Sequence, residues 1–237
     1  MKNEDKIRVQ KFIAQAGICS RRNAELLIEQ NRVKINGIIA RIGDKSNEKD
    51  IILIDNKQIN IQNKEYYLLN KPKGYICSSD DKYHQNLVVN LIPSSSRLYT
   101  VGRLDKDTTG AIIITNDGNL THHLSHPSFQ IEREYNVEID KVLTPIQLKE
   151  INQNFLVNNK ISYHKVIHLI DNFYKIILHQ GSYHHVKLIF EKFERKVINL
   201  HRRSYSFLNV DKMNVGEYRV IKPFEIKKLK YLKNNQN

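Results

Sequence analysis

The spacing of apolar residues predicts two short helices near the start of the chain. Apolar side chains between positions 9 and 16 recur at the three- and four-residue spacing of one helix face, and Gly17 ends that helix. Ser20 has the chemistry of a helix N-cap, and residues 24–28 carry a second apolar face. The first segment therefore begins with a helix pair.

Short runs rich in isoleucine and valine follow, and each pair of runs is separated by turn residues. The pairs are 33–35 with 38–40 around Asn36-Gly37, and 51–54 with 59–61 around Asp55-Asn56. Asn and Gly adopt the left-handed conformations that close tight hairpins. We expect four short strands, which with the helices make a small α/β domain at residues 7–63.

A second segment mixes strand and helix patterns and predicts an α+β domain at residues 65–230 with a mixed, largely antiparallel central sheet. The expected strands cover 66–70, 111–115, 134–139, 161–169 and 173–179. The expected helices cover 87–91, 119–125, 144–154 and 183–192. We expect the lysine- and asparagine-rich tail after Lys227 to be frayed.

The chain is strongly basic: 38 Lys and Arg against 25 Asp and Glu give a net charge of +13. Such an excess favours a polyanionic partner, with nucleic acid first, although a biased lysine-rich surface would give the same count. Two cysteines in 237 residues indicate neither a disulfide framework nor a zinc site. With no membrane-spanning run, these features favour a cytoplasmic monomer without metal or cofactor.

The loop before the apolar run 111–115 carries the most distinctive chemistry. Its sequence is Gly102-Arg103-Leu104-Asp105-Lys106-Asp107-Thr108-Thr109-Gly110. Asp and Gly are common turn residues, so composition alone does not distinguish Asp105 from Asp107. Gly102-Arg103-Leu104-Asp105 resembles the signature of the pseudouridine synthases, in particular their small branch that modifies ribosomal RNA. The resemblance implies that Asp105 is the catalytic nucleophile.

The first segment carries a resemblance of its own, to the RNA-binding domain named after ribosomal protein S4. The matching stretches are 17–24 and 32–37. Physically, Arg21 and Arg22 lie at the start of the expected second helix, where backbone donors and guanidinium groups can bind phosphate together. Lys11, Arg32 and Lys34 are expected to extend this S4-like RNA-binding face, with ribosomal RNA as partner.

Three further residues acquire roles from the resemblance. Lys187, in the stretch 181–187, matches the basic residue that pairs with the nucleophile and keeps its carboxylate ionised. Tyr135 matches the active-site tyrosine, which stacks on the target base or assists proton transfer. Arg103 is expected to bind a phosphate of the flipped nucleotide, although a structural ion pair is nearly as good an interpretation.

Basic residues elsewhere suit the rim of such a site, because a flipped nucleotide needs phosphate contacts. The candidates for this role are Lys71, Lys73 and the pair Arg202-Arg203. Charged runs of this kind are more often solvated surface.

Several alternatives stay open at the level of sequence. Residues 17–24 and 88–93 resemble the large-subunit enzymes, which we favour slightly, whereas 183–187 and 200–202 resemble the small-subunit enzyme. Leu188 stands where the family usually has a second basic residue, which keeps a non-catalytic RNA-binding protein in view. A nuclease that uses Asp105 and Asp107 with metal would be inactivated by chelators.

Overall fold

The computed structural model describes residues 6–79 and 85–232, which form two compact units. The first unit runs to Glu65 and takes in Ser94–Leu98 and Asn116–Gly118, and the second contains the rest. Each unit has its own hydrophobic core.

The first unit packs two helices against a small sheet. Helices α1 (Val9–Gln15) and α2 (Arg21–Glu29) accompany an antiparallel sheet of order β3-β2-β5-β6, and β1 pairs with β4. These strands are β1 (Ile7–Arg8), β2 (Val33–Ile35), β3 (Ile38–Ile39), β4 (Lys45–Ser46), β5 (Ile52–Ile54) and β6 (Lys57–Ile59). As predicted, Ser20 caps α2: its hydroxyl accepts a hydrogen bond from the Asn23 backbone N–H at 3.2 Å.

One strand of this unit begins earlier than the sequence pattern predicted. The expected strand 59–61 lies instead at Lys57–Ile59. It pairs antiparallel with β5, with Lys57 opposite Ile54 and Ile59 opposite Ile52. Asp55 and Asn56 both have positive φ, so the turn needs only these two residues. The apolar pattern missed Lys57 and Gln58 because they are polar and exposed.

The second unit is built on a nine-stranded sheet of order β13-β14-β10-β15-β9-β7-β17, with β16 beside β15 and β8 beside β9. Its strands are β7 (Tyr66–Lys71), β8 (Tyr99–Val101), β9 (Thr109–Thr115), β10 (Arg133–Ile139), β13 (His164–Ile170), β14 (Phe173–Leu178), β15 (Val197–Tyr205), β16 (Leu208–Asn209) and β17 (Tyr218–Val220). Within these strands only β15 and β9 pair in parallel. The predicted α+β fold with a mixed, largely antiparallel sheet is confirmed.

A glycine makes the parallel junction of this sheet possible. Gly110 in β9 is paired with Arg202 in β15 and has a φ of +110°. A Cβ atom at position 110 would lie 2.2 Å from the carbonyl oxygen of Arg202. The two halves of the sheet meet this closely because position 110 carries no side chain.

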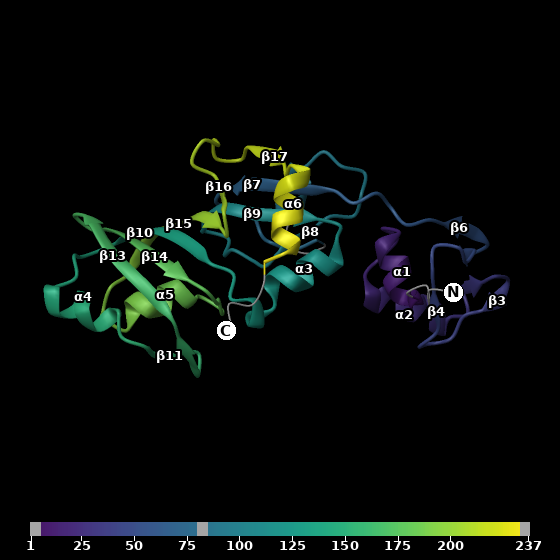
Figure 1. Cartoon of the computed structure of the whole chain (residues 1–237), viewed down its shortest axis with the longest axis horizontal. Coiled ribbons are helices and arrows are strands. Elements are labelled where there is room, and N and C mark those ends of the chain that lie inside the picture. Colours follow the sequence, from purple (N-terminus) through teal and green to yellow (C-terminus); the bar gives the residue numbers. More distant parts are fainter. Residues whose placement is uncertain (1–5, 80–84, 233–237) are drawn as a thin grey trace. The chain divides into compact units, whose positions relative to one another are not determined.

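Helices cover the sheet of the second unit, as Figure 1 shows. Helix α3 (Gly118–Ser125) and helix α6 (Pro223–Lys230) share a core with β7 and β9, to which they contribute Leu120, Leu124 and Leu229. At the other end of the sheet lie α4 (Pro145–Ile151), α5 (His185–Glu191) and the hairpin of β11 (Phe155–Val157) and β12 (Lys160–Ser162). Two 3-10 turns, Val88–Leu91 and Pro127–Phe129, complete the unit.

The C-terminal segment corrects an expectation. The tail after Lys227 was predicted to be frayed, but α6 continues to Lys230. Leu229 is fully buried, so burial of this side chain fixes the last turn of the helix. Residues 233–237, on which the rest of that prediction falls, lie outside the described residues.

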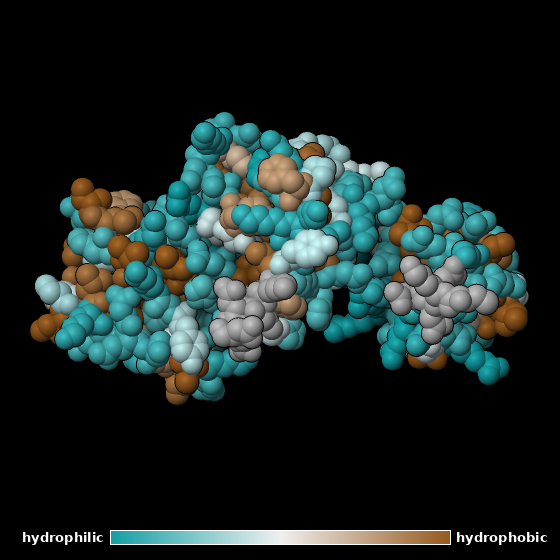
Figure 2. All heavy atoms as spheres, in the orientation of Figure 1, coloured by the Kyte–Doolittle hydropathy of each residue, from teal (hydrophilic) through white to brown (hydrophobic). Residues whose placement is uncertain are grey.

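Apolar side chains also lie on the surface of the second unit, around α4 and β13 (Figure 2). The exposed apolar residues there include Ile146, Leu169, Ile170 and Phe173. Among the described residues, no helix combines the length and apolar character needed to span a membrane.

Candidate active site

The loop that carries Asp105 joins β8 to β9 and is closed by its own backbone. Gly102 leaves β8 with a φ of +71°, and the Thr108 backbone N–H donates to the carbonyl oxygen of Asp105 at 3.1 Å. The Gly74 N–H donates to the carbonyl of Lys106 at 2.8 Å, which ties the loop to the segment after β7. The nucleophile candidate is thereby held on a short, hydrogen-bonded turn.

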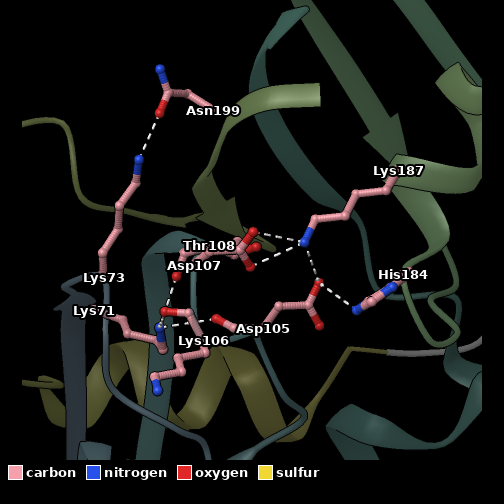
Figure 3. A network of polar contacts seen from close by, with 9 residues as sticks. All are labelled: Lys71, Lys73, Asp105, Lys106, Asp107, Thr108, His184, Lys187 and Asn199. Atoms are coloured by element: carbon pink, nitrogen blue, oxygen red, sulfur yellow. Dashed lines mark hydrogen bonds and ion pairs between the residues drawn. The ribbon is translucent and has the colours of Figure 1, made fainter. Parts of the chain in front are cut away.

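Lys71 corrects an expectation, because it was predicted on the RNA-contacting rim and is instead fully buried. Its ammonium donates hydrogen bonds to the carbonyl oxygens of Thr108 at 2.8 Å and Asp105 at 3.1 Å (Figure 3). Burial lowers the pKa of this ammonium. Lys71 therefore stabilises the Asp105 loop from within, because its position at the end of β7 directs its side chain beneath the loop rather than toward solvent.

Asp105 lies against a cation from a distant part of the chain. Nζ of Lys187, on α5, is 3.3 Å from Oδ2 of Asp105, and it donates to both carboxylate oxygens of Asp107 at 3.0 and 2.9 Å (Figure 3). Burial alone would lower the pKa of the Lys187 ammonium, but the hydrogen bond with Asp107 and the charge of Asp105 raise it. Lys187 is therefore a cation shared by two carboxylates.

The same lysine lowers the pKa of the Asp107 carboxyl. Partial burial opposes this change, but the hydrogen bond and the charge of Lys187 outweigh it. The Asp107 side chain is 68% exposed and that of Asp105 is 30% exposed. Of the two, Asp105 is the carboxylate on the cavity wall.

His184 lies at the site although it was not predicted there from the sequence. Its Nε2 lies 3.6 Å from Oδ2 of Asp105, and its backbone is left-handed with a φ of 53°. The ring of Tyr183 stacks on the ring of His184 with centroids 3.8 Å apart. The adjacent histidines were visible in the sequence, but nothing there indicated which of them would face Asp105.

A cavity of about 430 Å³ opens beside Asp105. Tyr135, Arg103, Val186 and Leu200 line it, so it combines an aromatic ring, apolar walls and a cation. Tyr135 is 8% exposed on β10, and within residues 6–79 and 85–232 its hydroxyl has no hydrogen-bond partner. Arg103 is exposed and forms no ion pair within those ranges, which leaves its guanidinium available.

The pair Arg202-Arg203 also differs from its expected place on the rim. Arg202 is 2% exposed; its Nε donates to the carbonyl of Ala111 at 2.6 Å, and its guanidinium lies over the ring of Tyr205. Arg203 forms ion pairs with Glu134 and Asp211. Arg202 is a buried part of the cavity wall, because β15 passes through the middle of the sheet.

Behind the site, two histidines and two serines form one hydrogen-bonded chain. His185 bonds through Nδ1 to Ser182 Oγ at 2.9 Å and through Nε2 to Ser162 Oγ at 2.8 Å. Ser162 Oγ continues to His164 Nδ1 at 2.9 Å, and His164 Nε2 ends the chain at the carbonyl of Ile151. Because the carbonyl can only accept, His164 donates from Nε2. With both rings neutral, Ser162 then donates to His164, His185 donates to Ser162, and Ser182 donates to His185. Burial lowers the pKa of His185 to about 4.

In the first unit, the predicted RNA-binding residues have different surroundings. Arg21 lines a hollow of about 390 Å³ with the basic residues Lys6, Arg8, Lys11 and Lys45. Of these four, only Lys11 was predicted from the sequence to contact RNA. Arg22 is exposed at the start of α2. Arg32 forms a bidentate ion pair with Asp55, and Lys34 donates to Asn56 Oδ1 at 3.1 Å, so both already have partners.

Lys73, the remaining rim candidate, is exposed and donates to Oδ1 of Asn199 at 2.6 Å (Figure 3). Within the described ranges, no group of three or more His, Cys, Asp or Glu side chains is arranged to hold a metal ion.

The fold and the site have clear relatives. Residues 65–196 match the family described as RNA pseudouridylate synthase, and residues 7–63 match the S4 domain. The chain is 30% identical to ribosomal large subunit pseudouridine synthase B of Bacillus subtilis, over 95% of this chain and 96% of that protein. It is 31% identical to ribosomal small subunit pseudouridine synthase A of Haemophilus influenzae, over 94% and 99%.

Among solved structures, a pseudouridylate synthase superposes with a TM-score of 0.69 at 29% identity, covering 94% of this chain and 99% of that one. The chain belongs to the RNA pseudouridylate synthase family and carries an S4 domain before the catalytic domain. The resemblance in the sequence to this enzyme class is therefore confirmed.

Proposed function

We propose that this protein converts a specific uridine of ribosomal RNA to pseudouridine, with Asp105 as the nucleophile. The observation that carries the proposal is the Asp105 carboxylate beside Lys187, 3.3 Å away, on the wall of a cavity that Tyr135 also lines. The relatives named for large- and small-subunit ribosomal RNA support this substrate class.

The reaction needs an ionised carboxylate and no net oxidant or reductant. The bond between N1 of uracil and C1′ of ribose breaks, the base rotates, and a bond from C5 to C1′ forms; C5 gives up a proton and N1 gains one. Asp105 adds to the ribose or to the base and leaves again in the last step. The ammonium of Lys187 favours the charged carboxylate that this attack requires.

The other residues of the cavity receive positioning and binding roles. Tyr135 stacks on the flipped uracil, and its hydroxyl, which has no hydrogen-bond partner among the described residues, can serve in the proton transfer from C5. Val186 and Leu200 form an apolar floor. Arg103, without an ion pair in residues 6–79 and 85–232, binds a phosphate of the flipped nucleotide, and Lys73 adds a second cation at the rim.

We assign RNA binding to the domain at 7–63 and catalysis to the domain at 65–230. We propose that the protein acts as a cytoplasmic monomer and needs no cofactor. Arg21 and Arg22 supply the main phosphate contacts, because their guanidinium groups flank the start of α2. Arg32 and Lys34 contribute less, since RNA has to compete with Asp55 and Asn56 for them.

The test is pseudouridine mapping on unmodified large- and small-subunit ribosomal RNA incubated with the purified protein, with and without a chelator. One new pseudouridine, insensitive to chelation, is the expected result, and large-subunit RNA is the substrate we favour. Binding without modification on either RNA or its assembly particles would overturn the catalytic proposal in favour of a binding protein. Strand cleavage that the chelator stops would instead indicate a nuclease.

A further inference from the structure

An exposed aromatic ring lies at the cavity and has no part in the reaction proposed above. Tyr183 is 72% exposed, yet its ring is stacked on His184 at 3.8 Å with an interplanar angle of 18°. Both side chains line the cavity that contains Asp105. One face of the Tyr183 ring therefore covers His184, and the opposite face is open to solvent.

The backbone beneath this ring is held by an independent element. Nδ2 of Asn158, in the turn between β11 and β12, donates to the carbonyl of Tyr183 at 2.9 Å and to Oγ of Ser182 at 2.7 Å. His184 adopts the left-handed conformation that directs its ring toward Asp105. The Tyr183 ring is thus positioned by its backbone and by His184, with little burial of its own.

A flat, positioned, half-open ring beside cationic groups suits one class of ligand. Nucleobases stack on tyrosine whatever their identity, because each base has a π face. Arg103 lines the same cavity, and its guanidinium attracts the phosphate backbone. When a uridine leaves its stack, its neighbour loses a stacking partner, and a ring at this position can replace it.

We propose that Tyr183, supported by His184, is a stacking platform for the nucleobase next to the uridine being isomerised. The inference rests on the proposed function, since it adds a subsite for a flanking nucleotide to that RNA-binding cavity. His184 joins this subsite to the nucleophile: one face of its ring contacts Tyr183, and its Nε2 lies 3.6 Å from Asp105.

The experiment uses a stem-loop RNA copied from the mapped site, with an abasic nucleotide in place of the 5′ or the 3′ neighbour of the uridine. The full-length wild type and Tyr183→Leu are compared by kcat/KM on each RNA. We expect Tyr183→Leu to lower kcat/KM roughly 5- to 100-fold, mainly through KM, on the intact RNA. An abasic neighbour on one side should lower the wild type similarly and cause no further loss in the variant.

Two controls separate stacking from general damage. Tyr183→Phe keeps the ring, so it should retain both the affinity and the sensitivity to the abasic neighbour. Tyr231→Leu removes another tyrosine of 70% exposure that does not line the cavity, and it should behave as wild type. If the wild type is active, and the losses of kcat/KM from Tyr183→Leu and from the abasic nucleotide add for both the 5′ and the 3′ neighbour, the stacking platform is overturned and the proposed function is not. A wild type that forms no pseudouridine would contradict the proposed function itself.

Discussion

Nζ of Lys187 lies between two carboxylates, 3.3 Å from Oδ2 of Asp105 and 2.9 Å from Oδ2 of Asp107. A single ammonium shared in this way holds Asp105 near the cavity while Asp107 faces solvent. We therefore propose that the carboxylate chemistry depends on the positive charge at position 187.

Replacing Lys187 by Met should lower kcat about 100-fold, because the carboxylate pair loses its counter-charge and its nearest hydrogen-bond donor. Lys187→Arg keeps the charge and should retain activity within roughly tenfold of wild type. Single-turnover formation of pseudouridine measures both. Lys192→Met, at the end of the same helix and outside the cavity, is the matched control. Equal rates for Lys187→Met and Lys192→Met would contradict the role of this ammonium.

Lys71→Met should destabilise the protein by about 2 kcal/mol or more, because the buried carbonyls of the Asp105 loop lose their donor. Lys73→Met makes the same change two residues away at an exposed position, and it should alter the free energy of unfolding by less than about 0.5 kcal/mol. Urea denaturation compares the two variants. Indistinguishable midpoints would show that Lys71 does not hold the loop.

Lys71 is a residue whose position could not be predicted from the sequence. Lysine is rarely fully buried, so a Lys71 in a Lys-Pro-Lys-Gly stretch was placed on the surface, and the same bias misplaced Arg202. Their burial depends on long-range pairing of β7 and β15 with β9, which local patterns do not contain. Strand β15 also escaped prediction, because charged residues interrupt its apolar pattern.

Local chemistry was predictable where it acts within a few residues. The cap at Ser20 and the hairpin at Asn36-Gly37 are set by side-chain hydrogen bonding and left-handed propensity, and both were predicted correctly. At the site, Asp105 and Lys187 came from a recognised motif, and the structure brings them together. His184 could not be found in this way, because its direction depends on the left-handed backbone of one residue.

The buried histidine chain predicts loss of stability in acid. The pKa of His185 is lowered to about 4 in the folded protein, against about 6.5 in an unfolded chain, so the unfolded state binds more protons between these values. Stability should therefore fall as the pH drops from about 6.5 to about 4, by about 3 kcal/mol when the loss is complete.

His185→Gln removes this titration while keeping a donor and an acceptor for Ser162 and Ser182. The urea denaturation midpoints of the wild type and of His185→Gln are compared at neutral pH and near pH 4.5. The expected result is a shallower acid loss in the variant. Parallel pH profiles for the variant and the wild type would show that His185 does not titrate as its burial implies.

Phosphate contacts at α2 should appear in the salt dependence of RNA binding. Replacing Arg21 and Arg22 together by Gln should weaken binding and reduce the slope of log affinity against log salt by about 2, because each arginine neutralises one phosphate. Arg32→Gln should change the slope less, since Arg32 is already paired with Asp55. Filter binding to ribosomal RNA across a salt series measures both, and an unchanged slope in the double variant would remove these arginines from the interface.

The most direct measurement is the rate of pseudouridine formation on the mapped ribosomal RNA by Asp105→Asn and Asp107→Asn. Both changes remove one carboxylate charge from the same loop and one partner of Lys187. We expect no product from Asp105→Asn, and product from Asp107→Asn at a rate within roughly tenfold of wild type, because the Asp107 side chain is 68% exposed and does not line the cavity. Turnover by Asp105→Asn at a rate similar to that of Asp107→Asn would contradict the assignment of Asp105 as the nucleophile.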